Sequence, residues 1–268
     1  MRQLCRHRHH GKQIKQKGIK KQMTDKVAVI TGVSSGLGKA AAVKFMQHGV
    51  KVVGISRSKP DFEPDLWIEA DITKPDGRGK ALQQTMEKFG RADVLINNAG
   101  KGGYSTWEEL PEQDLRDIFE LNFFALNAMT IIFLPLLKES KGTVMNISSI
   151  AGDLYVPCMG AYCATKSAVT AFSNTIRPEL KRYGIKVIDV APGRIDTGFS
   201  SRSLGNRQPP HTPGGGCPDA FASALFKAWR QSRRSLIYPG WNRIAVPMLK
   251  LFPGLYDRLS IRIWNLDK

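Results

Sequence analysis

The stretch VAVITGVSSGLGKAAAVKF, residues 27–45, joins an apolar run to a second apolar segment through three glycines. The run 26–31 is rich in valine and isoleucine and predicts a buried strand, and the residues from Gly36 onward predict a helix over 36–48. In a strand-to-helix turn of this kind, backbone N–H groups approach a pyrophosphate at the positive end of the helix dipole. The stretch therefore predicts a dinucleotide-binding turn, although a tight turn requires glycine for steric reasons alone.

The same alternation continues along the chain. Short apolar runs predict seven strands, and the segments between them predict helices that cover both faces of a parallel sheet. We therefore expect an α/β fold with a doubly wound, Rossmann-type sheet in a single domain, and Pro178 should bend one helix or tighten its last turns. The expected strands are 26–31, 51–56, 67–70, 93–97, 143–148, 186–191 and 236–238, and the expected helices are 36–48, 77–89, 112–137, 161–183, 219–231, 244–252 and 255–264.

The net charge of +17 on 268 residues is unevenly distributed. Residues 1–22 hold eight Lys or Arg and no acid, residues 23–197 hold 21 basic and 20 acidic residues, and residues 198–268 hold 11 basic and three acidic ones. A nearly neutral body argues against a nucleic-acid groove. We expect a basic, disordered leader over 1–22 and one folded domain over 23–268.

Cysteine and histidine positions indicate neither disulfides nor a metal site, because no Cys-x-x-Cys or Cys/His ligand spacing occurs. No secretory signal is visible after the basic start, so we expect a cytoplasmic protein with reduced thiols. The most apolar window, 118–137, contains Glu120, Asn122 and Asn127, which favours a buried helix over a membrane span.

The end of the second expected strand indicates which dinucleotide binds. Arg57 stands 19 residues beyond Gly38, where an NAD-binding protein places an acid on the ribose 2′-hydroxyl. A guanidinium there would pair with a 2′-phosphate, so NADP(H) is preferred and NAD(H) remains possible. The alternative is a solvated cation at the end of a strand.

Tyr162 and Lys166 are four residues apart at the start of a predicted helix, so both side chains lie on one face. A phenol titrates near pH ~10, and a neighbouring ammonium lowers that value, which makes Tyr162 a usable acid or base. By itself such a pair is a routine helix-surface contact. Its context is the ends of two strands, Asn97-Asn98-Ala99-Gly100 and Asn146-Ile147-Ser148-Ser149, which meet at the ligand-binding edge of the sheet.

These motifs together resemble the short-chain dehydrogenase/reductase family over about residues 26–197: Thr31 to Gly38, Asn97 to Gly100, Ser149, Tyr162-x-x-x-Lys166, and Pro192-Gly193 with Thr197. The resemblance implies that Tyr162 exchanges the proton, that Ser149 binds the substrate oxygen and that Lys166 also holds the nicotinamide ribose. It further implies that Asn122 holds a water in a proton relay.

The resemblance also implies the remaining contacts of the cofactor. Asp71 and Ile72 would lie near the adenine, and Pro192 to Thr197 near the nicotinamide amide, although Asp71 could instead cap a turn. The full implied set, besides Arg57, Tyr162 and Lys166, is Thr31, Gly32, Ser34, Ser35, Gly36, Leu37, Gly38, Asp71, Ile72, Asn98, Ala99, Gly100, Pro192, Gly193, Ile195 and Thr197.

Residues 198–268 are expected to form a substrate lid and a C-terminal segment for substrate or subunit contacts. Eight of the 14 residues in 205–218 are Gly or Pro, which indicates a mobile lid. Residues 229–268 interleave cations with aromatic and aliphatic residues, as in segments that lie on an anionic membrane. The alternative is that this segment walls the substrate pocket and packs against a second subunit of a homodimer or homotetramer.

The pattern as a whole predicts an NADPH-dependent reductase that interconverts a carbonyl and an alcohol on a hydrophobic substrate, such as a lipid, steroid-like or aromatic molecule. Two alternatives stay open at this point. One is an NAD(H)-dependent alcohol dehydrogenase acting on a small polar substrate. The other is a non-catalytic protein that senses a dinucleotide or acts at a membrane surface.

Overall fold

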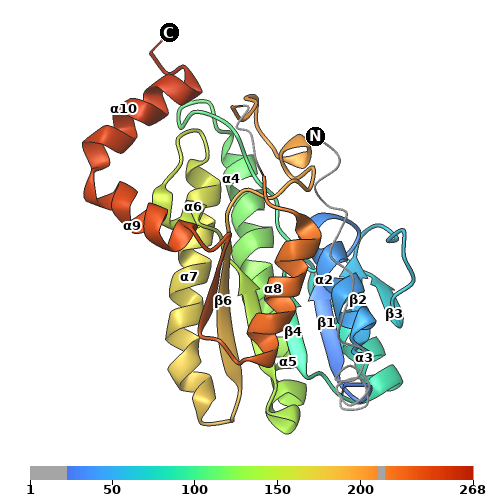
Figure 1. Ribbon diagram of the computed structural model, residues 1–268. Helices are drawn as coiled ribbons and strands as arrows, with labels where there is room; N and C mark the ends of the chain where they lie inside the picture. The colour runs from blue at the N-terminus through green and yellow to red at the C-terminus, as the bar shows by residue number, and fades with distance from the viewer. Residues whose placement is uncertain (1–22, 211–214, 268) are drawn as a thin grey trace.

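The computed structural model describes residues 23–210 and 215–267, so the basic leader and part of the expected lid lie outside the described residues. Strands and helices alternate from the first strand to the last, as Figure 1 shows. The strands are β1 (Val27–Thr31), β2 (Lys51–Ser56), β3 (Leu66–Glu69), β4 (Val94–Asn97), β5 (Thr143–Ile147), β6 (Lys186–Pro192) and β7 (Ser235–Tyr238). The helices are α2 (Gly36–Gln47), α3 (Pro75–Phe89), α4 (Glu112–Phe119), α5 (Ala125–Ser140), α6 (Ala151–Leu154), α7 (Gly160–Lys181), α8 (Pro218–Arg230), α9 (Asn242–Leu251) and α10 (Pro253–Trp264).

All seven strands pair in parallel in the order β3-β2-β1-β4-β5-β6-β7. The chain first winds outward from β1 to β3, then returns to β4 on the other side of β1 and winds outward again. This reversal confirms the doubly wound sheet, and it opens a crevice at the carboxyl ends of β1 and β4.

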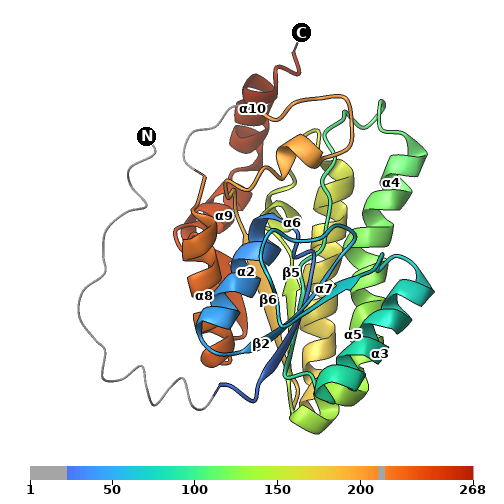
Figure 2. The same cartoon turned by 90° about the vertical axis from the view of Figure 1, so that its right-hand side faces the viewer.

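Alternate residues of each strand face opposite layers of helices. Ala28 and Ile30 pack with α2 and α8, whereas Val27 and Val29 pack on the side that carries α3, α5 and α7. Both strand faces are apolar because both are covered by helices, which is why the sequence reads as continuous valine and isoleucine runs. Figure 2 shows the two helical layers on either side of the sheet.

The helix expected over 112–137 is interrupted. A single π-helical turn, Glu120–Phe124, separates α4 from α5, and α5 runs on to Ser140. A π turn holds one residue more than an α turn. Apolar positions recur at helical spacing on both sides of this turn, so the sequence pattern does not show the interruption. The short helix α6 was not predicted, and Pro178 leaves α7 continuous to Lys181.

The stretch Glu112–Ser140 is long and apolar enough to cross a membrane, and 44% of its most apolar window is buried inside the domain. Met129, Phe133 and Leu137 of α5 are fully buried against the sheet. A core helix of a domain meets the same criterion of length and composition, which is the role this stretch has here.

Candidate active site

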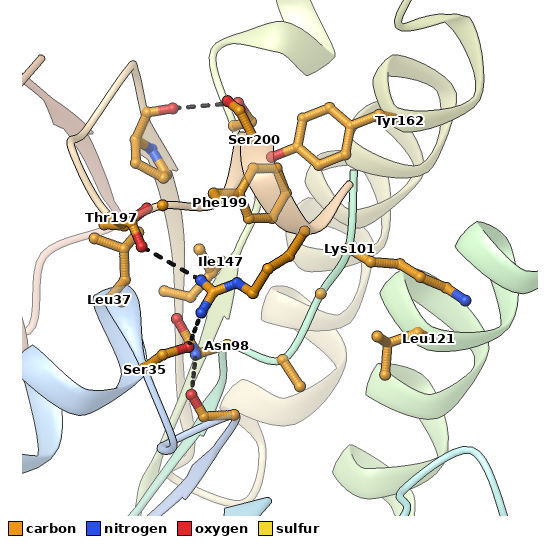
Figure 3. Close-up of a pocket in the computed structure, with 18 of the residues that line it drawn as sticks. Ser35, Leu37, Asn98, Lys101, Leu121, Ile147, Tyr162, Thr197, Phe199 and Ser200 are labelled. Atoms are coloured by element: carbon orange, nitrogen blue, oxygen red, sulfur yellow. Dashed lines mark hydrogen bonds between the residues drawn. The ribbon is translucent and has the colours of Figure 1, made fainter. Parts of the chain in front are cut away.

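A cleft of about 1760 Å³ opens at the carboxyl ends of β1, β4, β5 and β6. It is larger than the ~300–1,000 Å³ of a typical small-molecule site, so it has room for a dinucleotide and a second molecule. Figure 3 shows residues from distant segments converging on it, with Ser35 and Leu37 at one side and Tyr162 and Phe199 at the other.

The turn after β1 fits a pyrophosphate. Ser35 caps α2 with an extended backbone, no side chain bonds to the first-turn amides, and the first turn contains no acid. Gly36 has φ +59°, a conformation that favours glycine, and a Cβ on Gly32 would lie 2.9 Å from the Ala99 Cα. The amides at this helix N-terminus therefore remain available for an anion.

Two residues of the expected cofactor set support the turn from behind and do not line the cleft. The Thr31 hydroxyl accepts hydrogen bonds of 3.0 Å from the backbone amides of Asn98 and Ala99, which ties β1 to the end of β4. Gly38 packs against the Gly32 carbonyl, where no Cβ would fit. Other members of the set, Gly32, Ser34, Ser35, Gly36, Leu37, Asn98, Ala99 and Gly100, line the cleft.

The far end of the cleft combines a cation and a carboxylate. Arg57 is exposed at the end of β2, and Asp71 and Ile72 line the same wall. Burial opposes ionisation of Asp71, but hydrogen bonds from Thr73 and the charge of Arg57 outweigh it, so the pKa of Asp71 is lowered. Asp71 accepts bonds from the Thr73 amide and hydroxyl at 3.0 and 2.8 Å, so it caps a turn and also faces the cleft.

Tyr162 and Ser149 meet at the inner end of the cleft. The Tyr162 hydroxyl is buried beside the Ser149 hydroxyl, and the Tyr162 ring lies 5.7 Å from that of Phe199. Ser149 is held in place because its Oγ donates to the Pro192 carbonyl at 3.2 Å and accepts from the Ala151 amide at 3.1 Å. The neighbouring Ser148 instead donates to the Val190 carbonyl within the sheet, so Ser149 is the serine that faces Tyr162.

Lys166 is buried one helical turn after Tyr162. Its ammonium donates to the Ile147 carbonyl at 2.7 Å and lies 5.6 Å from the centre of the Tyr162 ring. Burial lowers the pKa of Lys166 to about 8, against the opposing effect of the Asp189 carboxylate.

The expected lowering of the Tyr162 pKa by Lys166 is not found in this structure. Burial raises the pKa of the phenol, and the Ser149 hydroxyl opposes that rise only in part. The physical reason is that the Lys166 ammonium bonds to a backbone carbonyl and not to the phenol, while burial of the phenol among its neighbours disfavours its charged form.

Asn122, the fourth implied catalytic residue, is fully buried within the π turn and does not line the cleft. Its carboxamide accepts from the Lys101 amide and donates to the Lys101 carbonyl, both at 2.9 Å, and also donates to Thr165 at 3.1 Å. Asn122 thus holds in place the segment that follows Gly100. The Asn122 oxygen and the Lys166 ammonium both lie beside Gly100, where a Cβ would meet them at 3.1 and 3.6 Å.

At the nicotinamide end of the expected site, Pro192, Gly193, Ile195 and Thr197 all line the cleft. Sequence reasoning missed Arg202, which lies in the 3₁₀ turn Ser200–Arg202. Its guanidinium donates to the Ser35 hydroxyl at 2.6 Å and to the Thr197 carbonyl at 3.3 Å. A cation from the segment that follows β6 therefore reaches the phosphate-binding turn, and no short-range signal in the sequence indicates this contact across 167 positions.

The rest of the cleft next to Tyr162 is mostly apolar. Ring and aliphatic side chains from four separate segments form this wall: Tyr104, Val156, Met159, Phe199, Leu204, Ile263 and Trp264. The Tyr104 and Trp264 rings stack at 6.1 Å, which brings the C-terminal helix over the cleft. Among residues 23–210 and 215–267, no group of three His, Cys, Asp or Glu side chains could hold a metal ion.

Comparison with known proteins places this geometry among oxidoreductases. A dehydrogenase/reductase family protein 7-like of Anopheles gambiae is 30% identical over 263 residues, covering 88% of this chain and 82% of that protein. An NADPH-dependent 3-dehydrocapnine reductase of Ornithobacterium rhinotracheale is 38% identical over 63% of this chain and 65% of its own length. A 3-ketodihydrosphingosine reductase of Bacteroides thetaiotaomicron is 35% identical, with coverage of 66% and 67%.

Solved structures agree with these relatives. A short-chain dehydrogenase from Streptomyces avermitilis superposes with a TM-score of 0.74 at 29% identity, covering 90% of this chain and 96% of that one. The family model described as short chain dehydrogenase matches residues 26–207, which include the glycine turn, Ser149, Tyr162 and Lys166. The chain belongs to the short-chain dehydrogenase family, and it is a dehydrogenase or reductase.

Proposed function

We propose that this protein is an NADP(H)-dependent reductase that converts a ketone or aldehyde on a hydrophobic substrate into an alcohol. The observation that carries the proposal is the meeting of Ser149 and Tyr162 between a phosphate-binding turn and an apolar wall. Bound NADPH would supply the hydride.

The protein's own groups handle the oxygen and its proton. The Ser149 hydroxyl donates to the Pro192 carbonyl and accepts from the Ala151 amide in this structure, and it would turn its one proton toward the substrate's carbonyl oxygen to position it. The Tyr162 hydroxyl then protonates that oxygen as negative charge develops on it. The phenol carries its proton at neutral pH and can donate it in the reductive direction. Burial raises its pKa and makes it a weaker acid than a free phenol, so the negative charge that develops on the substrate oxygen must drive the transfer.

The preference for NADP(H) is proposed from the charge at the adenosine end of the cleft. Arg57, Lys59 and Lys74 all line that end, where a 2′-phosphate would add negative charge. An acid on the ribose hydroxyls would favour NAD(H), but the residue that follows β2 is Arg57.

The hydrophobic substrate is proposed from the apolar wall beside Tyr162. Two similar proteins bear names of reductases whose substrates are a 3-dehydrocapnine and a 3-ketodihydrosphingosine. We propose the same chemical class here, a ketone on a long-chain amphiphile.

The test is a panel of carbonyl compounds in which chain length and polarity vary, with loss of NADPH followed by absorbance and the assay repeated with NADH. Turnover should rise with acyl-chain length and should be faster with NADPH. Preference for short polar carbonyls with NADH would contradict the proposal. Tyr162→Phe serves as the inactive control on every active substrate.

A further inference from the structure

Helices α9 and α10 and the residues that flank them expose ten large apolar side chains, and we call all of these except Ile261 the C-terminal apolar face. Ile244 is 73% exposed and Leu251 is 69% exposed, values unusual for aliphatic residues gathered in one place. The members of the face are Trp241, Ile244, Met248, Leu251, Phe252, Leu255, Leu259, Ile263 and Leu266. Both helices follow β7 at one edge of the sheet and extend away from it (Figure 1).

These side chains are ordered by helical spacing. In α9, Ile244, Met248 and Leu251 follow one another at intervals of four and three residues, while Val246 points to the interior and is buried. In α10, Leu255, Leu259 and Ile263 follow one another at intervals of four residues, and the exposed Ile261 lies outside this row. Each helix is therefore amphipathic and presents its apolar stripe to the outside of the domain.

Cations surround this face. Between Asp219 and Asp257 the sequence contains no acid, and the segment 227–262 contains eight Lys or Arg and only Asp257 as an acid. Arg243, Arg258 and Arg262 are exposed on the two helices themselves. Arg258 lies three residues after Leu255 and Arg262 three residues after Leu259, which places both beside the apolar stripe.

A second copy of the chain does not match this pattern. In a twofold interface the same patch supplies both sides, and segment 227–262 offers only Asp257 to pair with its eight cations, so positive charge would accumulate there. Like charges placed against each other oppose association. An apolar stripe bordered by cations instead matches a lipid surface, where apolar side chains enter the acyl boundary and each cation near anionic headgroups adds attraction.

We propose that the C-terminal apolar face docks on an anionic lipid bilayer. The position of α10 determines where a docked bilayer lies relative to the cleft. Ile263 and Trp264 both line the cleft, and Ile263 is also 51% exposed and belongs to the face. A bilayer on this face therefore lies next to the cleft mouth. If the proposed function holds, the substrate can pass directly between the bilayer and the apolar wall.

The experiment is co-sedimentation of the full chain with phosphatidylcholine vesicles and with vesicles containing about 30% phosphatidylserine. We expect binding to the anionic vesicles and weak binding to the neutral ones, with the anionic binding reduced by salt. Leu251→Asp combined with Leu255→Asp should weaken anionic binding by about tenfold or more, because both side chains are lost from the apolar contact and two negative charges are added.

The matched control is Met86→Asp. Met86 is 50% exposed on α3, which follows β3 at the opposite edge of the sheet, and its replacement should leave vesicle binding unchanged. Circular dichroism and thermal unfolding of each variant check that the fold is intact.

Three results would overturn the proposal. The first is that the wild type does not bind anionic vesicles, and the second is that the double variant binds them as well as the wild type does. The third is that the wild type forms a dimer that binds no vesicles and the double variant is a monomer. The second result would assign lipid binding to another part of the chain, and the third would make the face a subunit interface. The assay does not depend on catalysis. A protein that docks but reduces no carbonyl would refute the proposed function alone.

Discussion

Replacement of Arg57 by Glu tests the proposed cofactor preference at one side chain. Arg57 is exposed at the end of β2 and lines the adenosine end of the cleft, so its loss removes a contact with the ligand without disturbing the core. A hydrogen bond to a charged group contributes about 1.5–3 kcal/mol, and an exposed guanidinium belongs to the lower part of that range. About 1.5–2 kcal/mol corresponds to a loss of roughly 10–30-fold in kcat/KM for NADPH.

The introduced carboxylate should also improve NADH, because an acid at this position can accept hydrogen bonds from the ribose hydroxyls. The assay is steady-state kinetics with each cofactor at a saturating carbonyl concentration, reported as the ratio of the two kcat/KM values. Lys59→Glu, which makes the same charge change at a neighbouring residue of the cleft wall, is the matched control and should move the ratio less. A ratio that changes by less than about threefold for Arg57→Glu would refute the assignment of Arg57 to the 2′-phosphate.

Three further variants probe the rest of the site. Arg202→Ala should raise KM for NADPH and NADH by a similar factor, about three- to tenfold, because it removes a cation that reaches Ser35. Fluorescence titration measures the binding of each cofactor. Weaker binding of NADPH alone would contradict the prediction. Tyr162→Phe should lower kcat by about 10²–10⁴-fold while NADPH binding stays within about twofold, so retained turnover would disprove its role as the acid. Asp189→Asn removes a charge that raises the pKa of Lys166, whose value is about 8, so any activity that depends on the protonated lysine should fall at lower pH than in the wild type. A pH profile measures this shift, and an unmoved or alkaline-shifted profile would refute the coupling.

The sheet could be predicted because each strand is recognisable from a short run of consecutive residues. Residues 27–30, Val-Ala-Val-Ile, are apolar on both faces, as a strand covered by two helical layers requires. The turn after β1 could be predicted as well, because its three glycines lie between a strand and a helix and the other motifs lie at the same sheet edge. Strand β3 begins and ends one residue earlier than predicted, at Leu66 and Glu69, because Leu66 and Ala70 are both compatible with an edge strand.

The parts that could not be predicted depend on long-range contacts. Arg202 reaches Ser35 only because the lid folds back over the cleft, and Trp264 enters the wall only because α10 stacks on Tyr104. The pKa of Tyr162 was misjudged for a similar reason. Spacing shows that Lys166 is near, but it does not show that the ammonium donates to Ile147 or that the phenol is buried.

The π turn at Glu120–Phe124 sets how α4 and α5 are oriented about their common axis. It takes up one residue more than a regular turn, and Asn122 is fully buried within it. The same residues wound as one continuous α-helix would have regular hydrogen bonding throughout, which favours the isolated helix. That helix would also turn every residue of α5 by about 100° relative to α4, so Met129 and Phe133 could not stay in the core while α4 kept its present position. The irregular turn therefore keeps two helical segments in phase with the sheet, and the more regular helix would belong to the less stable protein.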